Sequence, residues 1–145
     1  MTLDNLVSIG RLQQIPPNPA YIAQSMTAAR RTLVDASSAA ISNETRFDAA
    51  YNSIMHVAIA ALAAQGMRSS SNQPGHHQLA IQCLTWTLAI SGETLITLDV
   101  LRKKRHLISY SGDLVNDALV RDCIDEATQL LALASLVIAD SEAKP

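Results

Sequence analysis

The amino-acid sequence predicts an all-α protein, an up-and-down antiparallel bundle of four to five helices. Apolar residues make up 48% of the chain but aromatic residues only 3%, so alanine and leucine must supply most of the buried surface, which favours closely packed helices. No run of alternating β-branched residues appears, and strands are therefore not expected. At 145 residues the chain is long enough to form one hydrophobic core without disulfides or metal ions.

Three parts are expected along the chain: an N-terminal arm over 1–17, a helical bundle over 18–141 and a frayed tail over 142–145. Apolar residues over 1–15 recur at the spacing of a short amphipathic helix, which Pro16 and Pro17 end. This arm is expected to pack on the bundle or on a partner. Asn18 followed by Pro19 is typical of a helix start, and this helix is expected to reach about Asp35.

The next two helices follow from their apolar periodicity. One is expected from Asn43 or Glu44 to Gly66, with acidic residues early, as the helix dipole favours. The serine-rich segment 68–75 is expected to be a mobile loop. A third core helix is expected over 76–90, and its apolar residues, Trp86 among them, leave little polar surface.

The last two helices are separated by a glycine. One is expected from Glu93 to Gly112, with a buried face that consists of Leu95, Leu98, Leu101, Leu107 and Ile108. The other is expected to be capped by Asp113 and to reach about Asp140. Because it is apolar nearly all round after Ala127, it is expected to lie inside the bundle or in a subunit interface.

Charge and cysteine content exclude several functional classes. The net charge of −2 argues against a protein that is wrapped by nucleic acid over its whole surface, although a local basic patch remains compatible with it. Cys83 and Cys123 lie in apolar helical patterns without a CxxC spacing, so both are expected to be reduced core residues of a cytoplasmic protein.

The apolar stretch 130–139 is too short to cross a bilayer, and the N-terminus lacks the pattern of a signal peptide. No membrane association and no cofactor are expected, since no nucleotide-binding or hydrolase motif appears.

The histidines do not predict a metal centre. His76 and His77 are adjacent, so on a helix they diverge by roughly a third of a turn. No histidine pairs with a glutamate or a second histidine in the HExxH pattern. We therefore expect no metal ligands in this chain.

A basic cluster at Arg102, Lys103, Lys104 and Arg105 is the strongest functional feature, since it holds four of the eleven basic residues. Helical spacing places Asp99, Arg102, His106 and Tyr110 in one stripe, which Arg105 flanks. Arginine binds phosphate through two parallel hydrogen bonds, and histidine transfers protons near neutral pH. The cluster predicts a phosphate site with Arg105, His106 and Tyr110 as catalytic candidates, and with Arg102, Lys103 and Lys104 as nucleic-acid-binding candidates. The alternative is a solvated basic end of a helix, where cations are favourable in any case.

The runs Arg46–Tyr51, Gly75–His77 and Leu101–Tyr110 together resemble a HEPN domain. The resemblance covers about 19–140 and is strongest over 98–112. It implies an all-α bundle of four or five helices whose motif, an arginine, a polar residue and then a histidine, lies on the helix before the last. Arg105 and His106 match the first two positions, and Tyr110 stands where the family has its final histidine.

The resemblance implies a metal-independent endoribonuclease or toxin component that acts as a homodimer, with the motifs of two subunits meeting in one cleft. The RNA 2′-hydroxyl would attack the neighbouring phosphate, with Arg105 stabilising the charge and His106 assisting proton transfer. Because a phenol is a poor base at neutral pH, Tyr110 favours an alternative: an inactive module that binds RNA or nucleotide, or that docks to a nucleotidyltransferase or antitoxin partner. A structural bundle whose basic patch serves solubility is the third interpretation.

Overall fold

The computed structural model describes residues 2–70, 75–111 and 115–143, and within these ranges the chain forms six helices and two short strands. In chain order they are α1 (Leu3–Ser8), β1 (Leu12–Gln14), α2 (Pro19–Ala36), α3 (Asn43–Ala64), β2 (Met67–Ser69), α4 (His76–Thr87), α5 (Gly92–Ser111) and α6 (Asp117–Ala143).

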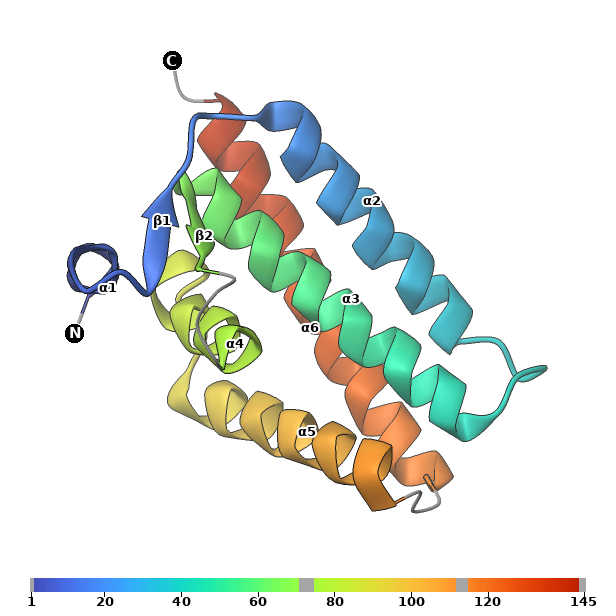
Figure 1. Cartoon of the computed structure of the whole chain (residues 1–145). Helices are drawn as coiled ribbons and strands as arrows, with labels where there is room; N and C mark the ends of the chain where they lie inside the picture. Colours follow the sequence, from blue (N-terminus) through green and yellow to red (C-terminus); the bar gives the residue numbers. More distant parts are fainter. Residues whose placement is uncertain (1, 71–74, 112–114, 144–145) are drawn as a thin grey trace.

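Three long helices, α2, α3 and α6, pack against one another and form the body of the molecule (Figure 1). The short α4 and the longer α5 pack on one side of this body. Helix α4 packs against α3, and α5 packs against α3 and α4. Chain direction alternates along α2, α3, α5 and α6 (Figure 1). The protein is therefore mainly helical, as the sequence predicts.

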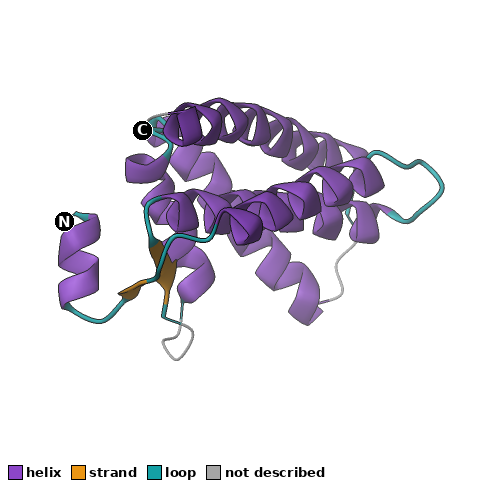
Figure 2. Cartoon of the chain, turned by 90° about the horizontal axis from the view of Figure 1, so that it is seen from above, coloured by secondary structure: helices purple, strands orange, loops and turns teal. Residues whose placement is uncertain are grey.

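The prediction that strands are absent was wrong, as was the prediction of one helix over 1–15. The strands β1 and β2 pair antiparallel, with Leu12 opposite Ser69 and Gln14 opposite Met67. They lie between α1 and the rest of the molecule (Figure 2). Gly10 has a φ of +78°, which ends the helical conformation and lets the chain extend. Strands of three residues are too short to show the alternation by which a strand is recognised.

Helix α3 lies at the centre of the core. It is the one helix in the described part of the chain that is long and apolar enough to span a membrane, but 67% of that apolar window is buried inside the protein. Phe47, Tyr51 and Ile54 on this helix are each no more than 2% exposed. The apolar character of α3 is therefore explained by packing against α2, α4 and α6, as in the core helix of a soluble protein.

Both cysteines are buried and unpaired, as predicted. Burial raises the pKa of the Cys83 thiol to about 11 and that of Cys123 to about 12. Thiolate is the reactive form of cysteine, so these side chains act as small apolar core residues.

Several helix ends agree with the sequence. The Asn18 side chain accepts a hydrogen bond from the Tyr21 amide at 3.1 Å, which makes Asn18 the cap of α2. Gly66, with a φ of +75°, follows the end of α3. Gly112 and Asp113, the predicted stop and cap, lie outside the described residues, and so do 144–145 of the predicted tail. In the described part, the Asn116 side chain caps α6 by accepting a 2.8 Å hydrogen bond from Leu119.

Two residues predicted to be buried are exposed. Trp86 is 42% exposed and Leu107 is 60% exposed, because α4 and α5 each bury one face only. Helix α6 likewise buries a stripe that includes Ala127, Leu130 and Ala134, while Leu136 on its other side is 68% exposed. The sequence pattern therefore predicted more burial around each of these helices than the structure shows.

Candidate phosphate-binding site

The site is built on the inner face of α5. Leu98 and Leu101 on this face are buried at 1% and 3% exposure. At helical spacing the same face continues with Arg102 and Arg105, whose side chains are only 23% and 32% exposed. Two guanidinium groups therefore occupy positions where an amphipathic helix ordinarily carries leucine.

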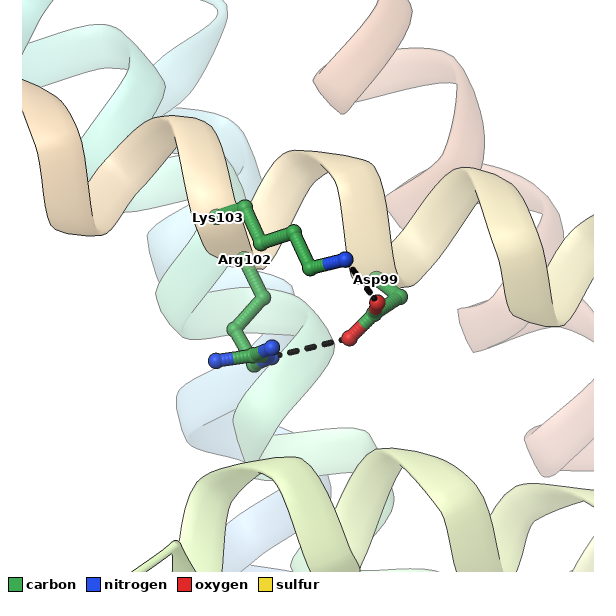
Figure 3. Close-up of polar contacts among 3 residues, drawn as sticks. All are labelled: Asp99, Arg102 and Lys103. Carbon is green, nitrogen blue, oxygen red and sulfur yellow. Dashed lines mark hydrogen bonds and ion pairs between the residues drawn. The ribbon is translucent and has the colours of Figure 1, made fainter.

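Arg102 is held within its own helix. Its Nε lies 3.0 Å from Oδ1 of Asp99, and Lys103 Nζ lies 3.1 Å from Oδ2 of the same carboxylate (Figure 3). Partial burial by itself raises the pKa of Asp99, but the hydrogen bonds from Arg102 and Lys103 outweigh burial and leave this pKa below its usual value. Asp99 is therefore a charged anchor that fixes the direction of the Arg102 side chain.

Arg105 reaches across to α3. Its guanidinium carbon lies 4.8 Å from the centre of the Tyr51 ring, within the range of a cation–π interaction. Its Nε lies 3.4 Å from Oδ1 of Asp48, close enough for an ion pair. This Nε is nevertheless buried and has no hydrogen-bond acceptor in the described part of the chain, since the Asp48 oxygen does not meet the geometry of a hydrogen bond. Arg105 thus presents a desolvated donor without an acceptor, which is costly in a protein interior.

Tyr51 and His77 complete the surroundings of Arg105. Burial raises the pKa of the Tyr51 phenol, against the opposing effect of the Arg105 and Arg102 charges. Burial lowers the pKa of His77, and the charges of His76 and Arg105 lower it further. The charge of Arg105 therefore acts on side chains of both α3 and α4, and the positive charge of this region comes from α5.

The other predicted residues lie on different sides of α5. Lys103 is 64% exposed, and Lys104 is an exposed residue that lines a groove beside α6. His106 is exposed, and because consecutive helical residues point about 100° apart, its ring lies on a different side from Arg105. The Tyr110 side chain lies outside the described residues. The structure therefore partly buries Arg102 and Arg105 on the inner face of α5, whereas Lys104 and His106 are exposed.

Three residues near the arginines were not predicted as site residues: Asp48, Tyr51 and His77. Asp48 and Tyr51 belong to the run 46–51 that contributes to the HEPN resemblance, and their spacing of three places them on one face of α3. That spacing was the available signal, but it does not indicate which later helix packs on that face.

No metal centre is indicated around these side chains. Histidine, cysteine, aspartate and glutamate form no cluster of three or more suited to a metal ion in 2–70, 75–111 and 115–143. His76 and His77 contact each other edge to face, with ring centres 4.6 Å apart. Arg102 and Arg105 are the candidates in this region for binding an anion, and each lies beside a carboxylate.

No protein-family model matches the sequence, and a comparison with curated proteins finds no matching protein.

Proposed function

We propose that this chain is a cytoplasmic RNA-binding protein of the HEPN type, and that it holds RNA phosphate between α3 and α5. One observation carries the proposal: Arg105 is partly buried over Tyr51 with an Nε donor that lacks a hydrogen-bond acceptor among the described residues. The Nε itself is buried, but a guanidinium group has four further N–H donors, and these bind phosphate oxygens better than an ammonium group does.

The second arginine supports a phosphate rather than a carboxylate ligand. Arg102 and Arg105 lie on the same face of α5, and the closest contact of each with its carboxylate is through Nε. A guanidinium group has four N–H donors besides Nε, which suits binding of a group with several charged oxygens. Lys104 is less suited to RNA because it shares its groove with Asp122, Asp125 and Glu126.

Binding of a fluorescein-labelled single-stranded RNA, measured by anisotropy at several salt concentrations, tests this proposal. Arg105→Gln and Arg102→Gln are each expected to weaken binding about tenfold, the effect of losing a charge-assisted contact. Each is also expected to flatten the salt dependence, because fewer counterions are displaced. Arg121→Gln, at an exposed position of α6, is the matched control and is expected to bind as the parent does. Equal affinity for all four proteins would contradict the proposal.

A second candidate is the function that the resemblance implies, a metal-independent endoribonuclease or toxin component that acts as a homodimer. The observation that favours it is that His106 is exposed and lies one helical turn after Arg102. In this reaction the RNA 2′-oxygen attacks phosphorus and loses its proton, the bond to the 5′-oxygen breaks, and that oxygen gains a proton. The products are a 2′,3′-cyclic phosphate and a 5′-hydroxyl, with His106 as the proton-transfer group.

Cleavage is tested by incubating the labelled RNA with the protein in EDTA and resolving the products on a denaturing gel. The enzyme proposal expects cyclic-phosphate ends that disappear in both Arg105→Gln and His106→Ala. RNA that stays intact while binding persists would favour the binding module alone. Docking to a nucleotidyltransferase or antitoxin partner stays a prediction.

A further inference from the structure

The segment that joins β1 to α2 (Figure 1) borders a pocket with a volume of about 320 Å³. This volume lies within the range of small-molecule binding sites. The pocket shares no residue with the candidate phosphate site, so its ligand does not depend on RNA being the ligand of α5. Its lining consists of Ile15, Pro16, Pro17, Asn18, Tyr21 and Arg68.

The wall of the pocket that precedes α2 is held in place by the chain itself. Its two consecutive prolines fix their own φ angles. The Ile15 amide donates a 2.8 Å hydrogen bond to the Gly66 carbonyl, and the Asn18 side chain accepts one of 3.1 Å from the Tyr21 amide. Both ends of this segment are therefore anchored before a ligand binds, which lowers the entropic cost of binding.

The polar side chains of the pocket supply hydrogen-bond donors. Arg68 Nε donates a 2.9 Å hydrogen bond to Oε1 of Gln13, its partner across the strand pair, and the guanidinium group has four further N–H donors. These four make no hydrogen bond or ion pair within 2–70, 75–111 and 115–143. Because the Asn18 side-chain oxygen faces the Tyr21 amide, its NH₂ group is a second donor. No aspartate or glutamate is among the lining residues that the structure describes, so the pocket suits an anion.

The remainder of the lining offers apolar surface. Pro16 and Pro17 are exposed, and Tyr21 is 38% exposed. Covering these rings with an apolar group is favourable in proportion to the area that is buried. The single guanidinium group balances one negative charge, and its planar fork matches the two oxygens of a carboxylate.

We propose that this pocket binds a small monocarboxylate with an apolar or aromatic body. Arg68 binds the carboxylate through two parallel hydrogen bonds, and the Asn18 NH₂ group donates a third. The body of the ligand covers the rings of Pro16, Pro17 and Tyr21. The chemistry differs from that of the candidate phosphate site, where two arginines suit a group with more negative charge.

Titration of the full chain with phenylacetate and with hexanoate, followed by amide chemical shifts in NMR spectra, tests the class of ligand. At least one of the two acids is expected to bind saturably, with the largest shifts at Asn18, Tyr21 and Arg68. The amide of that acid, which lacks the charge, and acetate, which lacks the body, are each expected to bind at least about tenfold more weakly. Absence of saturable binding by both acids, or equal affinity for the acid and its amide, would overturn the proposal.

Substitutions in the same titration locate the site. Arg68→Gln is expected to weaken binding of the acid about tenfold, the effect of losing a charge-assisted contact, and Tyr21→Ser is expected to weaken it because less apolar surface is buried. Arg121→Gln, at an exposed position of α6, is the matched control and is expected to bind as the parent does. Circular dichroism of each variant confirms that it is folded. A folded Arg68→Gln variant with the affinity of the parent would overturn the proposal.

RNA binding by the Arg68→Gln variant separates this pocket from the phosphate site. Because Arg68 lies on β2 and not on α5, the variant is expected to lose the acid and to retain RNA. Failure of the parent to bind RNA would leave the expected binding of the acid unchanged.

Discussion

At the scale of single residues, Arg105 is the side chain whose environment is hardest to explain as scaffolding. A structural bundle would gain more from an apolar residue at this position, because a partly buried charge loses hydration and here has a poorly aligned partner in Asp48. Replacing buried charges by apolar residues of similar size is often neutral or stabilising. An arginine that costs stability is better explained by ligand binding.

Arg105→Met is therefore expected to leave the free energy of unfolding unchanged or to raise it, while RNA binding weakens. Urea unfolding followed by circular dichroism measures the first quantity. Arg46→Met is the contrasting control, because Arg46 Nε donates a 2.8 Å hydrogen bond to the Ala36 carbonyl where α2 ends. Its loss is expected to cost about 1 kcal/mol. Destabilisation by Arg105→Met as large as that by Arg46→Met would assign Arg105 a structural role.

At the scale of elements, the junction of α3 and β2 depends on a glycine. Gly66 has a φ of +75°, a conformation that side chains with a Cβ rarely adopt. Its carbonyl accepts a 2.8 Å hydrogen bond from the Ile15 amide, which joins the segment after β1 to the end of α3. The turn at Gly66 therefore places the strand pair and the N-terminal arm against the helical body.

Gly66→Ala is expected to lower the free energy of unfolding by about 1 kcal/mol, the cost of a left-handed conformation for a residue with a Cβ. Gly92→Ala is the matched control, since a Cβ at Gly92 meets nothing within 4 Å and the residue begins α5. It is expected to be neutral or slightly stabilising. Thermal unfolding of the two variants beside the parent checks both expectations, and equal effects would mean that the positive φ carries no cost.

At the scale of the whole molecule, partly buried histidines make the stability of the fold depend on pH. Burial lowers the pKa of His56, which lies on the central helix α3, and also that of His77. In the unfolded chain these side chains bind protons with a pKa of about 6.5. The folded state binds these protons more weakly than the unfolded state does. The free energy of unfolding is therefore highest above the unfolded-state pKa, and it falls as the pH drops through the lower folded-state pKa.

The urea midpoint is accordingly expected to fall between pH 7.5 and pH 5.5, and His56→Gln is expected to reduce that fall. His76→Gln, at an exposed position, serves as the control. The raised pKa of Glu126 acts in the opposite direction but at more acidic pH, since its stabilising effect is complete only below the unfolded carboxyl pKa of about 4.3. A midpoint that is constant over this range, or that rises on acidification, would contradict the expected role of His56.

Periodicity, caps and glycines predicted helices over about 19–35, 43–66, 76–90 and 93–112. The observed helices are Pro19–Ala36, Asn43–Ala64, His76–Thr87 and Gly92–Ser111, so most ends are close, because caps and glycines are local signals. The sequence also identified Arg102 and Arg105 as candidate phosphate-binding residues, because the basic cluster is formed by consecutive residues. Only the tertiary structure decided which face of α5 turns inward, and hence that Arg105 meets Tyr51 and Asp48 while Lys104 meets the acids of α6. It likewise decided the pairing of β1 with β2, two segments more than fifty residues apart. The reason is physical: a helix or turn is specified by residues within one turn of each other, whereas the partner of a face is specified by packing of distant segments, which local spacing does not encode.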